Sequence, residues 1–306
     1  METIKNKTYS IEKSPLYQLK SRKKLLEMFY VQKYNLLEKL TLDQSNYKIY
    51  NIQDKNKPKK RKIEEPKDHL KKFHKRFNDL LQRIEVPEFV KAGIKGSCYV
   101  DNGRAHINGK YFFCSDIEKF FPNSRKQKVF QFLLYDLQME ADIASLLTSI
   151  LTYDNHLPTG APSSQLLTYW AYKKTFNDIY KKAKSYGILM TLFVDDLTFS
   201  SEQPIPQSFK DYVVNRLNSE GLSINKKKTK TFNENQYKKT TGTVISPDNK
   251  LLVPNKLQHK IYILKHKENK TDKEIMSLKD KIKCQNCNYE MSEEYEYCPK
   301  CGTKIK

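Results

Sequence analysis

Two adjacent carboxylates interrupt an apolar run at Phe193-Val194-Asp195-Asp196-Leu197. Ionised carboxylates cost several kcal/mol to remove from water unless a positive charge meets them, and aspartate is rare inside strands. A tight hairpin whose turn carries both acids to a surface resolves this conflict, and a divalent cation can bind there. The pair therefore predicts a metal-binding turn.

Asp116 supplies a third carboxylate, because it ends the apolar run Tyr111-Phe112-Phe113-Cys114-Ser115. Mg²⁺ favours one or two carboxylates plus substrate phosphates. Two such ions, roughly 4 Å apart, can activate an attacking hydroxyl and stabilise a leaving pyrophosphate. We predict Asp116 and Asp195 as the main Mg²⁺ ligands. Asp196, expected to point elsewhere on the turn, is predicted as a supporting ligand.

A loop containing proline and glycine, Leu157 to Gln165, leads into a predicted helix. Gly160 lacks a side chain and would let the backbone approach a base pair closely. Ser163 or Ser164 is predicted to cap the following helix.

The composition favours a polyanionic partner. The 306 residues contain 56 Lys and Arg against 35 Asp and Glu, which gives a net charge of +21, and 12% are aromatic. Lysines release counterions from phosphates, and aromatic rings stack on bases. The N-terminus lacks an apolar signal core and no long apolar run is present, so we expect a cytoplasmic, soluble chain without a membrane span.

Six cysteines are too few and too unevenly spaced for a disulfide framework in a chain of this length. Two stand alone, Cys98 and Cys114, and are predicted to be core residues. The other four form two Cys-x-x-Cys pairs, which predict a zinc ribbon with one structural Zn²⁺. The predicted zinc ligands are Cys284, Cys287, Cys298 and Cys301.

Hydrophobic periodicity predicts alternating strands and helices around these motifs. The pattern of strand, helix, two strands, helix and strand indicates an α+β layered fold. We expect helices over 14–45, 70–84, 163–184 and 209–217, and further helical stretches up to 151. We expect strands over 47–52, 61–63, 111–115, 222–225 and 240–246. A loop is expected over 155–162 and the Asp-Asp hairpin over 188–200.

In their order along the chain, these motifs resemble those of bacterial reverse transcriptases of the retron and group II intron lineage. The resemblance covers about residues 45–250. The matching segments are Arg61–Pro66 (Arg-x-Ile-x-x-Pro), Asp116–Phe121 (Asp-x-x-x-Phe-Phe), Leu157–Ser164 (Leu-Pro-Gln-Gly-Ala-Pro-x-Ser), Phe193–Ser200 (Tyr-Ala-Asp-Asp-Leu-Thr-Phe-Ser) and Gly221–Thr229 (Gly-x-x-Ile-Asn-x-x-Lys-Thr).

The resemblance implies a right-hand polymerase with fingers, palm and a short thumb, followed by the C-terminal zinc ribbon. The expected boundaries are an N-terminal helical segment at 1–45, fingers at 46–110, palm at 111–246 with part of the fingers at 122–155, thumb at 247–282 and ribbon at 283–306.

The same resemblance implies further roles. Asp116, Asp195 and Asp196 would be the catalytic residues. Arg61 would lie over the incoming nucleotide, and Phe121 occupies the steric-gate position that excludes a 2′-hydroxyl and so selects dNTPs. Lys228 would help to neutralise the leaving group. With Gly160, these residues make up the predicted substrate-binding set.

Two further segments resemble retron motifs. Asn102-Gly103-Arg104-Ala105-His106 is similar to Asn-Ala-x-x-His, and Thr240-Thr241-Gly242 is similar to Val-Thr-Gly. They imply recognition of a structured noncoding RNA that serves as both template and primer. The predicted RNA-binding residues are Asn102, His106, Thr241 and Gly242.

The expected function is RNA-directed DNA synthesis with two Mg²⁺, in a retron-type antiphage defence system. The expected partners are a cognate noncoding RNA with its cDNA, dNTPs and an effector protein. One alternative is a non-retron defence reverse transcriptase with unusual templating or protein-associated priming. Another is a catalytically idle RNA-binding scaffold, which the three aspartates disfavour. An RNA-dependent RNA polymerase is disfavoured by Phe121.

Overall fold

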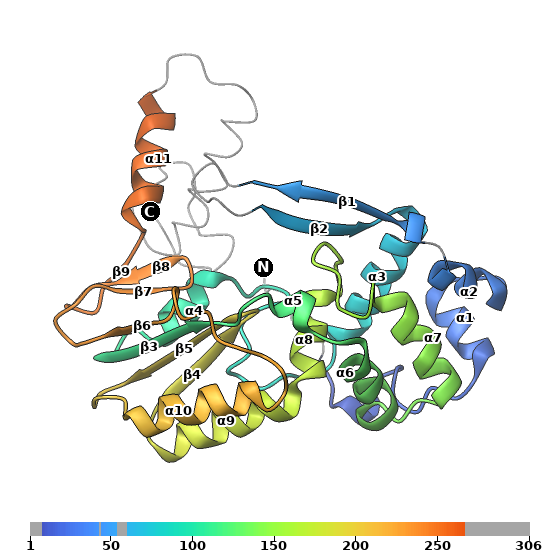
Figure 1. Cartoon of the computed structure of the whole chain (residues 1–306), viewed down its shortest axis with the longest axis horizontal. Coiled ribbons are helices and arrows are strands. Elements are labelled where there is room, and N and C mark those ends of the chain that lie inside the picture. Colours follow the sequence, from blue (N-terminus) through green and yellow to red (C-terminus); the bar gives the residue numbers. More distant parts are fainter. Residues whose placement is uncertain (1–7, 43, 54–59, 267–306) are drawn as a thin grey trace, which may run out of the picture. The chain divides into compact units, whose positions relative to one another are not determined.

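The computed structural model describes residues 8–42, 44–53 and 60–266 (Figure 1). The chain divides into two compact units, and each is described by itself. The first unit comprises Met1–Pro87, Ile117–Asp178 and Arg216–Ser223, and the second comprises Glu88–Asp116, Ile179–Asn215 and Ile224–Lys306.

The first unit is mostly helical and carries one two-stranded sheet. Aromatic rings fill part of its core: Phe29 stacks on Phe73 with 4.2 Å between ring centroids. Its elements are η1 (Ile11–Lys13), α1 (Arg22–Phe29), α2 (Tyr34–Leu42), η2 (Gln44–Asn46), β1 (Tyr47–Ile52), β2 (Arg61–Pro66), α3 (Asp68–Leu81), α5 (Phe120–Asn123), α6 (Lys126–Gln131), the π-helix η3 (Phe132–Asp136), α7 (Ala141–Leu151) and α8 (Ser164–Ala171).

The second unit is built on a four-stranded antiparallel sheet with the strand order β4-β5-β3-β6. A three-stranded sheet follows in the order β7-β8-β9. Its elements are α4 (Tyr99–Ala105), β3 (Tyr111–Asp116), β4 (Leu189–Phe193), β5 (Asp196–Ser201), β6 (Lys230–Phe232), β7 (Lys238–Thr240), β8 (Thr243–Ile245), β9 (Leu251–Leu252) and α11 (Asn255–His266). Two helices, α9 (Lys173–Ser185) and α10 (Gln207–Asn218), run from one unit into the other.

Burial of most of their residues explains the central strands β3 and β5. In β5, Phe199 is fully buried, stacks on Phe113 of β3 and meets Phe209 of α10 edge to face. In antiparallel strands, such aromatic pairs stabilise one register. The register sets Asp116 opposite Asp196, so the strand ends that carry the acids are aligned.

Several predicted elements differ in the structure. The helical region 14–45 is interrupted at Tyr30, which adopts the left-handed conformation (φ 56°) and ends α1. The helix predicted over 163–184 is two helices that meet at Tyr172. The strand predicted over 240–246 is a hairpin, because Gly242 (φ 70°) turns the chain between β7 and β8.

The strand predicted over 222–225 is reduced in the structure to a single bridge residue, Ile224. Asn225 donates a single backbone hydrogen bond to the carbonyl of Asp116, and its own carbonyl accepts from Lys228 and Thr229 in a turn. The fourth strand forms after this turn instead, at β6, where Phe232 pairs with Phe112.

Gly160 lies against the backbone of β2. Its N–H donates to the carbonyl of Glu64 at 3.2 Å. A Cβ atom at this position would come within 2.8 Å of the same oxygen, which is closer than real side chains approach. The glycine therefore permits close contact between the Leu157–Pro162 loop and the β1–β2 hairpin.

The capping prediction for the following helix was wrong. Ser163 precedes α8 but makes no side-chain cap, because its hydroxyl pairs with Nδ1 of buried His74 at 2.7 Å. The Ser164 hydroxyl donates to the carbonyl of Pro158. Both serines therefore fix the loop rather than the helix end.

The mixed α and β architecture was predicted correctly. The fingers, palm and thumb boundaries stay predictions. Within the described residues, no helix has both the length and the apolar character needed to cross a membrane.

Candidate active site

The Asp-Asp turn is a two-residue hairpin loop. Phe193 pairs with Asp196, which leaves Val194 and Asp195 as the loop residues. Val194 has φ 58°, a conformation that costs a β-branched residue energy. Backbone strain of this kind is typical of functional sites, where the surrounding sheet enforces it.

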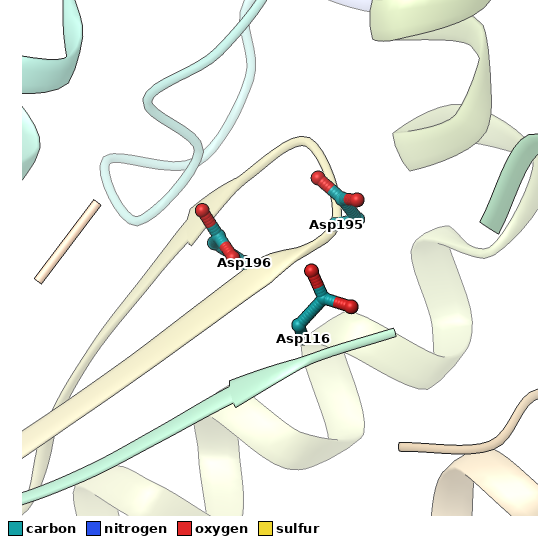
Figure 2. A group of neighbouring side chains, drawn as sticks. All are labelled: Asp116, Asp195 and Asp196. Atoms are coloured by element: carbon teal, nitrogen blue, oxygen red, sulfur yellow. The ribbon is translucent and has the colours of Figure 1, made fainter. Parts of the chain in front are cut away.

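Asp116, Asp195 and Asp196 converge at this edge of the sheet (Figure 2). Each offers a carboxylate oxygen, and these oxygens all lie within 4.8 Å of one another. Asp116 is 7% exposed, and Asp195 and Asp196 are partly buried. The expectation that Asp196 points elsewhere was wrong, because its carboxylate belongs to the same group.

The clustered charges perturb Asp196. Burial, followed by the charges of Asp195 and Asp116, raises its pKa to about 6, against the opposing effects of Lys228 and a hydrogen bond from Thr241. Like charges this close repel one another unless a cation or a proton intervenes. The cluster therefore favours a bound cation.

Lys228 is the nearest described counter-charge for Asp116. Its Nζ lies 2.5 Å from Oδ1 of Asp116, although more than half of the lysine side chain is exposed. Burial lowers the pKa of Lys228, but the hydrogen bond to Asp116 and the three aspartate charges outweigh it and raise the pKa. The sequence assignment of Lys228 to the site therefore agrees with its position, while its role stays a prediction.

A cavity of about 340 Å³ opens beside the acids. Its wall combines Asp116 and Asp196 with the turn between β7 and β8. The wall also carries four lysines, Lys227, Lys228, Lys230 and Lys239. Only Lys228 was predicted from the sequence. The run of lysines from 226 to 230 was the signal that could have identified more of them.

The four predicted RNA-binding residues divide into two kinds. Thr241 and Gly242 line the cavity. Asn102 and His106 are fully buried, so the structure gives their side chains internal partners. Their predicted contact with RNA stays a prediction.

His106 has hydroxyl partners on both ring nitrogens: Ser200 Oγ lies 2.7 Å from Nδ1 and Thr191 Oγ1 lies 2.7 Å from Nε2. A hydroxyl can donate or accept, so a neutral imidazole satisfies both contacts. Burial, and then the charge of Lys91, lowers its pKa to about 3. His106 therefore joins α4 to strands β4 and β5 as a neutral residue.

The three remaining predicted substrate residues belong to the first unit. Arg61 begins β2 and is exposed, Phe121 lies in α5 and is 8% exposed, and Gly160 contacts Glu64. Because that unit is described by itself, their roles towards the aspartates stay predictions.

Buried Glu64 and partly buried His156 form a charge pair that the sequence did not indicate. Nε2 of His156 lies 2.9 Å from Glu64, which also pairs with Lys62 at 3.0 Å. Nδ1 of His156 faces the carbonyl of Asp154. Since both ring nitrogens face acceptors, the doubly protonated imidazolium fits best. The pair joins the residue that precedes the Leu157–Pro162 loop to β2.

The pair makes stability depend on pH. The hydrogen bond to Glu64 raises the pKa of His156 against burial. Burial acts to raise the pKa of Glu64, but the hydrogen bonds from His156 and Lys62 outweigh it and lower the value. The histidine contribution is complete below pH 6.5 and is lost as pH rises through its raised pKa. The glutamate contribution is present above pH 4.5 and is lost as pH falls through its lowered pKa.

We therefore expect His156→Gln to lower the free energy of unfolding most between these two values, by on the order of 1 kcal/mol. The difference from the unmodified protein should shrink as pH rises through the raised pKa of His156. Urea unfolding across the pH range measures it. His69→Gln, at an exposed position in the same unit, is the control. A difference for His156→Gln that stays constant from acid to alkaline pH would contradict the charged pair.

The predicted zinc ligands lie outside the described residues. Of the two other cysteines, Cys114 lines the cavity, and burial followed by the charge of Asp196 raises its pKa to about 12. Its thiol is therefore protonated at neutral pH. The Cys98 side chain takes part in the first turn of α4, where Asp101 accepts from the Cys98 backbone N–H.

Comparison with known proteins places the chain in a family. Residues 52–275 match the family described as reverse transcriptase (RNA-dependent DNA polymerase), and residues 283–305 match the zinc-ribbon domain family. The Retron Ec86 reverse transcriptase of Escherichia coli is 34% identical over 206 residues, which are 66% of this chain and 64% of that protein. The Retron Se72 reverse transcriptase of Salmonella heidelberg is 27% identical over 189 residues, 60% of this chain and 50% of that protein.

The chain thus spans less than two thirds of the length of either relative. The family match nevertheless covers most of the chain and contains all three aspartates. The predicted resemblance is confirmed: this chain belongs to the reverse transcriptase family, is similar to retron reverse transcriptases and matches a zinc-ribbon domain at its C-terminal end.

Proposed function

We propose that this chain is an RNA-directed DNA polymerase that extends a nucleic-acid hydroxyl with dNTPs on an RNA template. One observation carries the proposal: in a member of the reverse transcriptase family, three carboxylates from two neighbouring strands and their turn converge within 4.8 Å. A catalytically idle scaffold would have no need of such a repulsive group.

The aspartates fit a pair of Mg²⁺ ions. They supply hard oxygen ligands in one place, and their mutual repulsion is relieved by a divalent cation. Bound Mg²⁺ would activate the attacking hydroxyl and stabilise the leaving pyrophosphate. Asp116, Asp195 and Asp196 would hold the ions, and Lys228, beside Asp116, would neutralise part of the charge on the triphosphate.

The lysines of the cavity are suited to a nucleic-acid strand. Lys227, Lys230 and Lys239 line the same cavity as the acids. Ammonium groups pair with backbone phosphates without reading the sequence. We assign these three lysines to the strand whose hydroxyl end is extended, with Thr241 and Gly242 as its neutral contacts.

The first unit would supply the nucleotide pocket. Arg61 would pair with the triphosphate and pack on the base, and Phe121 would exclude ribonucleotides. Gly160 keeps the Leu157–Pro162 loop close to β2, the strand that begins at Arg61. Through this contact, the loop would support the position of Arg61 on the hairpin.

The partner would be a structured noncoding RNA that is both template and primer source. Two relatives are named retron reverse transcriptases, and the net charge of +21 suits a polyanion. The setting we propose is a retron-type antiphage defence system with an effector protein. Sequencing the nucleic acid that copurifies with the chain tests this assignment: a defined RNA joined to its cDNA is expected, and random host RNA would contradict it.

The activity is tested with the purified full chain, an RNA template with an annealed primer, labelled dNTPs and Mg²⁺. RNA-templated incorporation is expected, and EDTA should stop it. A DNA template supplies the comparison. Incorporation of rNTPs in preference to dNTPs would identify an RNA polymerase and overturn the proposal.

We also expect one zinc ion per chain, held by the four cysteines of the ribbon. A segment this short cannot bury a core of its own, so metal binding must supply its folding free energy. Cys284→Ser should lower the zinc content measured by atomic emission spectroscopy, whereas Cys98→Ser, outside the ribbon, should not. Unchanged zinc in the Cys284→Ser variant would contradict the assigned ligands.

A further inference from the structure

Helix α4 contacts both sheets of the second unit, since it packs against β4 and β8. His106, which follows the helix, hydrogen-bonds to Thr191 of β4 and Ser200 of β5. These two strands carry the Asp195-Asp196 turn between them. The C-terminal end of α4 is therefore attached to the hairpin that bears two of the acids.

The body of α4 lies unusually close to the turn between β7 and β8. A Cβ atom on Gly103 would come within 2.3 Å of Thr243 Oγ1, and one on Gly242 would come within 2.9 Å of the Tyr99 ring. Glycine at both positions permits this contact. The two retron-like segments are therefore packed against each other rather than separate.

One hydrogen bond crosses this contact. Nδ2 of Asn102 donates to Oγ1 of Thr241 at 3.1 Å, and Asn102 is fully buried. Thr241 and Asp196 line the same cavity, and hydrogen bonding from the Thr241 side chain acts to lower the pKa of Asp196. Asn102, Thr241 and Asp196 therefore form a hydrogen-bond series that leads from the helix to the metal site.

Donor and acceptor rules fix which group donates in each hydrogen bond of this series. An amide NH₂ group only donates, and an ionised carboxylate only accepts. The Thr241 oxygen therefore accepts from Asn102, and its single proton points to Asp196. If the amide were turned over, its oxygen would compete with Asp196 for that proton. Among the described residues Oδ1 of Asn102 has no hydrogen-bond donor.

We propose that Asn102 is a positioning residue for the metal site: it orients the Thr241 hydroxyl, which in turn holds the Asp196 carboxylate. This role rests on the proposed function only in that Asp196 binds a divalent cation. Groups that hydrogen-bond to metal ligands typically change metal affinity 10- to 100-fold when they are removed. The buried asparagine thus serves the cation site rather than touching RNA.

The test measures Mn²⁺ binding to the full chain by calorimetry, without nucleic acid. Asn102→Asp replaces the donor with an acceptor, and Thr241→Val removes the hydroxyl while keeping the shape. We expect each variant to bind Mn²⁺ about tenfold more weakly. The double variant should lose little more Mn²⁺ affinity than either single variant, because both changes interrupt the same series of hydrogen bonds. Thr241→Ser, which keeps the hydroxyl, should recover most of the affinity.

Asn215→Asp adds the same negative charge at an exposed position of α10 and is the control for charge alone. Filter binding to a fixed structured RNA supplies the second readout, and in the folded Asn102→Asp variant it should change less than threefold. Unchanged Mn²⁺ affinity in Thr241→Val overturns the proposal. Loss of RNA affinity with intact Mn²⁺ binding overturns it as well, in favour of direct RNA recognition.

Two features keep this test decisive. If Asn102→Asp does not fold, Thr241→Val alone decides, because Thr241 is only partly buried and its change leaves the helix intact. If the unmodified chain makes no DNA but Thr241→Val still weakens Mn²⁺ binding, the proposed function fails while the positioning role stands.

Discussion

The double variant Asp195→Asn, Asp196→Asn is expected to lose RNA-templated DNA synthesis by about a thousandfold or more. An amide oxygen is neutral and binds Mg²⁺ weakly, so the two replacements leave Asp116 as the one ionised ligand of the three. Metal ions contribute several kcal/mol of charge stabilisation in such reactions, and about 4 kcal/mol corresponds to a thousandfold in rate. Primer extension with labelled dNTPs measures the loss.

The loss should not come from unfolding. Removing two like charges from a crowded site relieves repulsion, as the raised pKa of Asp196 indicates. We therefore expect the thermal midpoint of the double variant to equal or exceed that of the unmodified chain. Added Mn²⁺ should raise the midpoint of the unmodified chain but not that of the variant.

Asp211→Asn is the matched control, because Asp211 is an exposed aspartate of α10 whose partner is Gln207. It should leave synthesis unchanged. RNA affinity of the double variant should also be retained, since the lysines of the cavity remain. Synthesis by the double variant at a tenth of the normal rate or more would contradict the assignment of these aspartates as metal ligands.

Local pattern was sufficient to predict the acidic turn and the strands that hold it. Continuous apolar runs marked β3 and β5, and the position of the acids at their ends followed from strand geometry. Asp116, Asp195 and Asp196 therefore lie together as expected, although the orientation of Asp196 differs from the expectation. Asp196 is the first residue of β5 and pairs with Phe193 and Asp116, so the register of three strands sets the direction of its side chain, and no sequence pattern showed that register.

Contacts between distant segments could not be predicted in this way. His156 and Glu64 lie far apart in the chain, and only the fold shows that both ring nitrogens of the histidine face acceptors. The contact of Asn102 with Thr241 is similar. The two retron-like segments were recognised separately, but recognition of a motif gives no information on which residues it touches.

The strand predicted over 222–225 shows a third limit. Apolar residues there suggested pairing, yet Asn225 forms a turn with Thr229 and the ladder begins at Lys230. The register is decided by where Phe232 meets Phe112, a tertiary contact. Short strands at a sheet edge depend on such contacts more than on their own propensity.

Phe121→Ala is expected to admit ribonucleotides. In the proposed function its ring blocks the 2′-hydroxyl, and forcing an extra atom into a packed site typically costs 1–3 kcal/mol. Removing the ring should therefore reduce discrimination between dNTPs and rNTPs about 10- to 100-fold. The ratio of kcat/KM for dCTP and CTP on one RNA template measures it. Incorporation of dCTP should fall much less than the ratio changes.

Phe120 makes this test specific, because it lies beside Phe121 in α5 and is also buried, at 2% exposed. Its ring packs against Tyr172 and Phe176 in the core. Phe120→Ala should destabilise the chain at least as much as Phe121→Ala, yet leave sugar selection intact. Phe121→Val, which removes less volume, covers the case in which alanine prevents folding. If all three folded variants discriminate between dCTP and CTP as well as the unmodified chain does, then α5 supports the core and another residue selects the sugar.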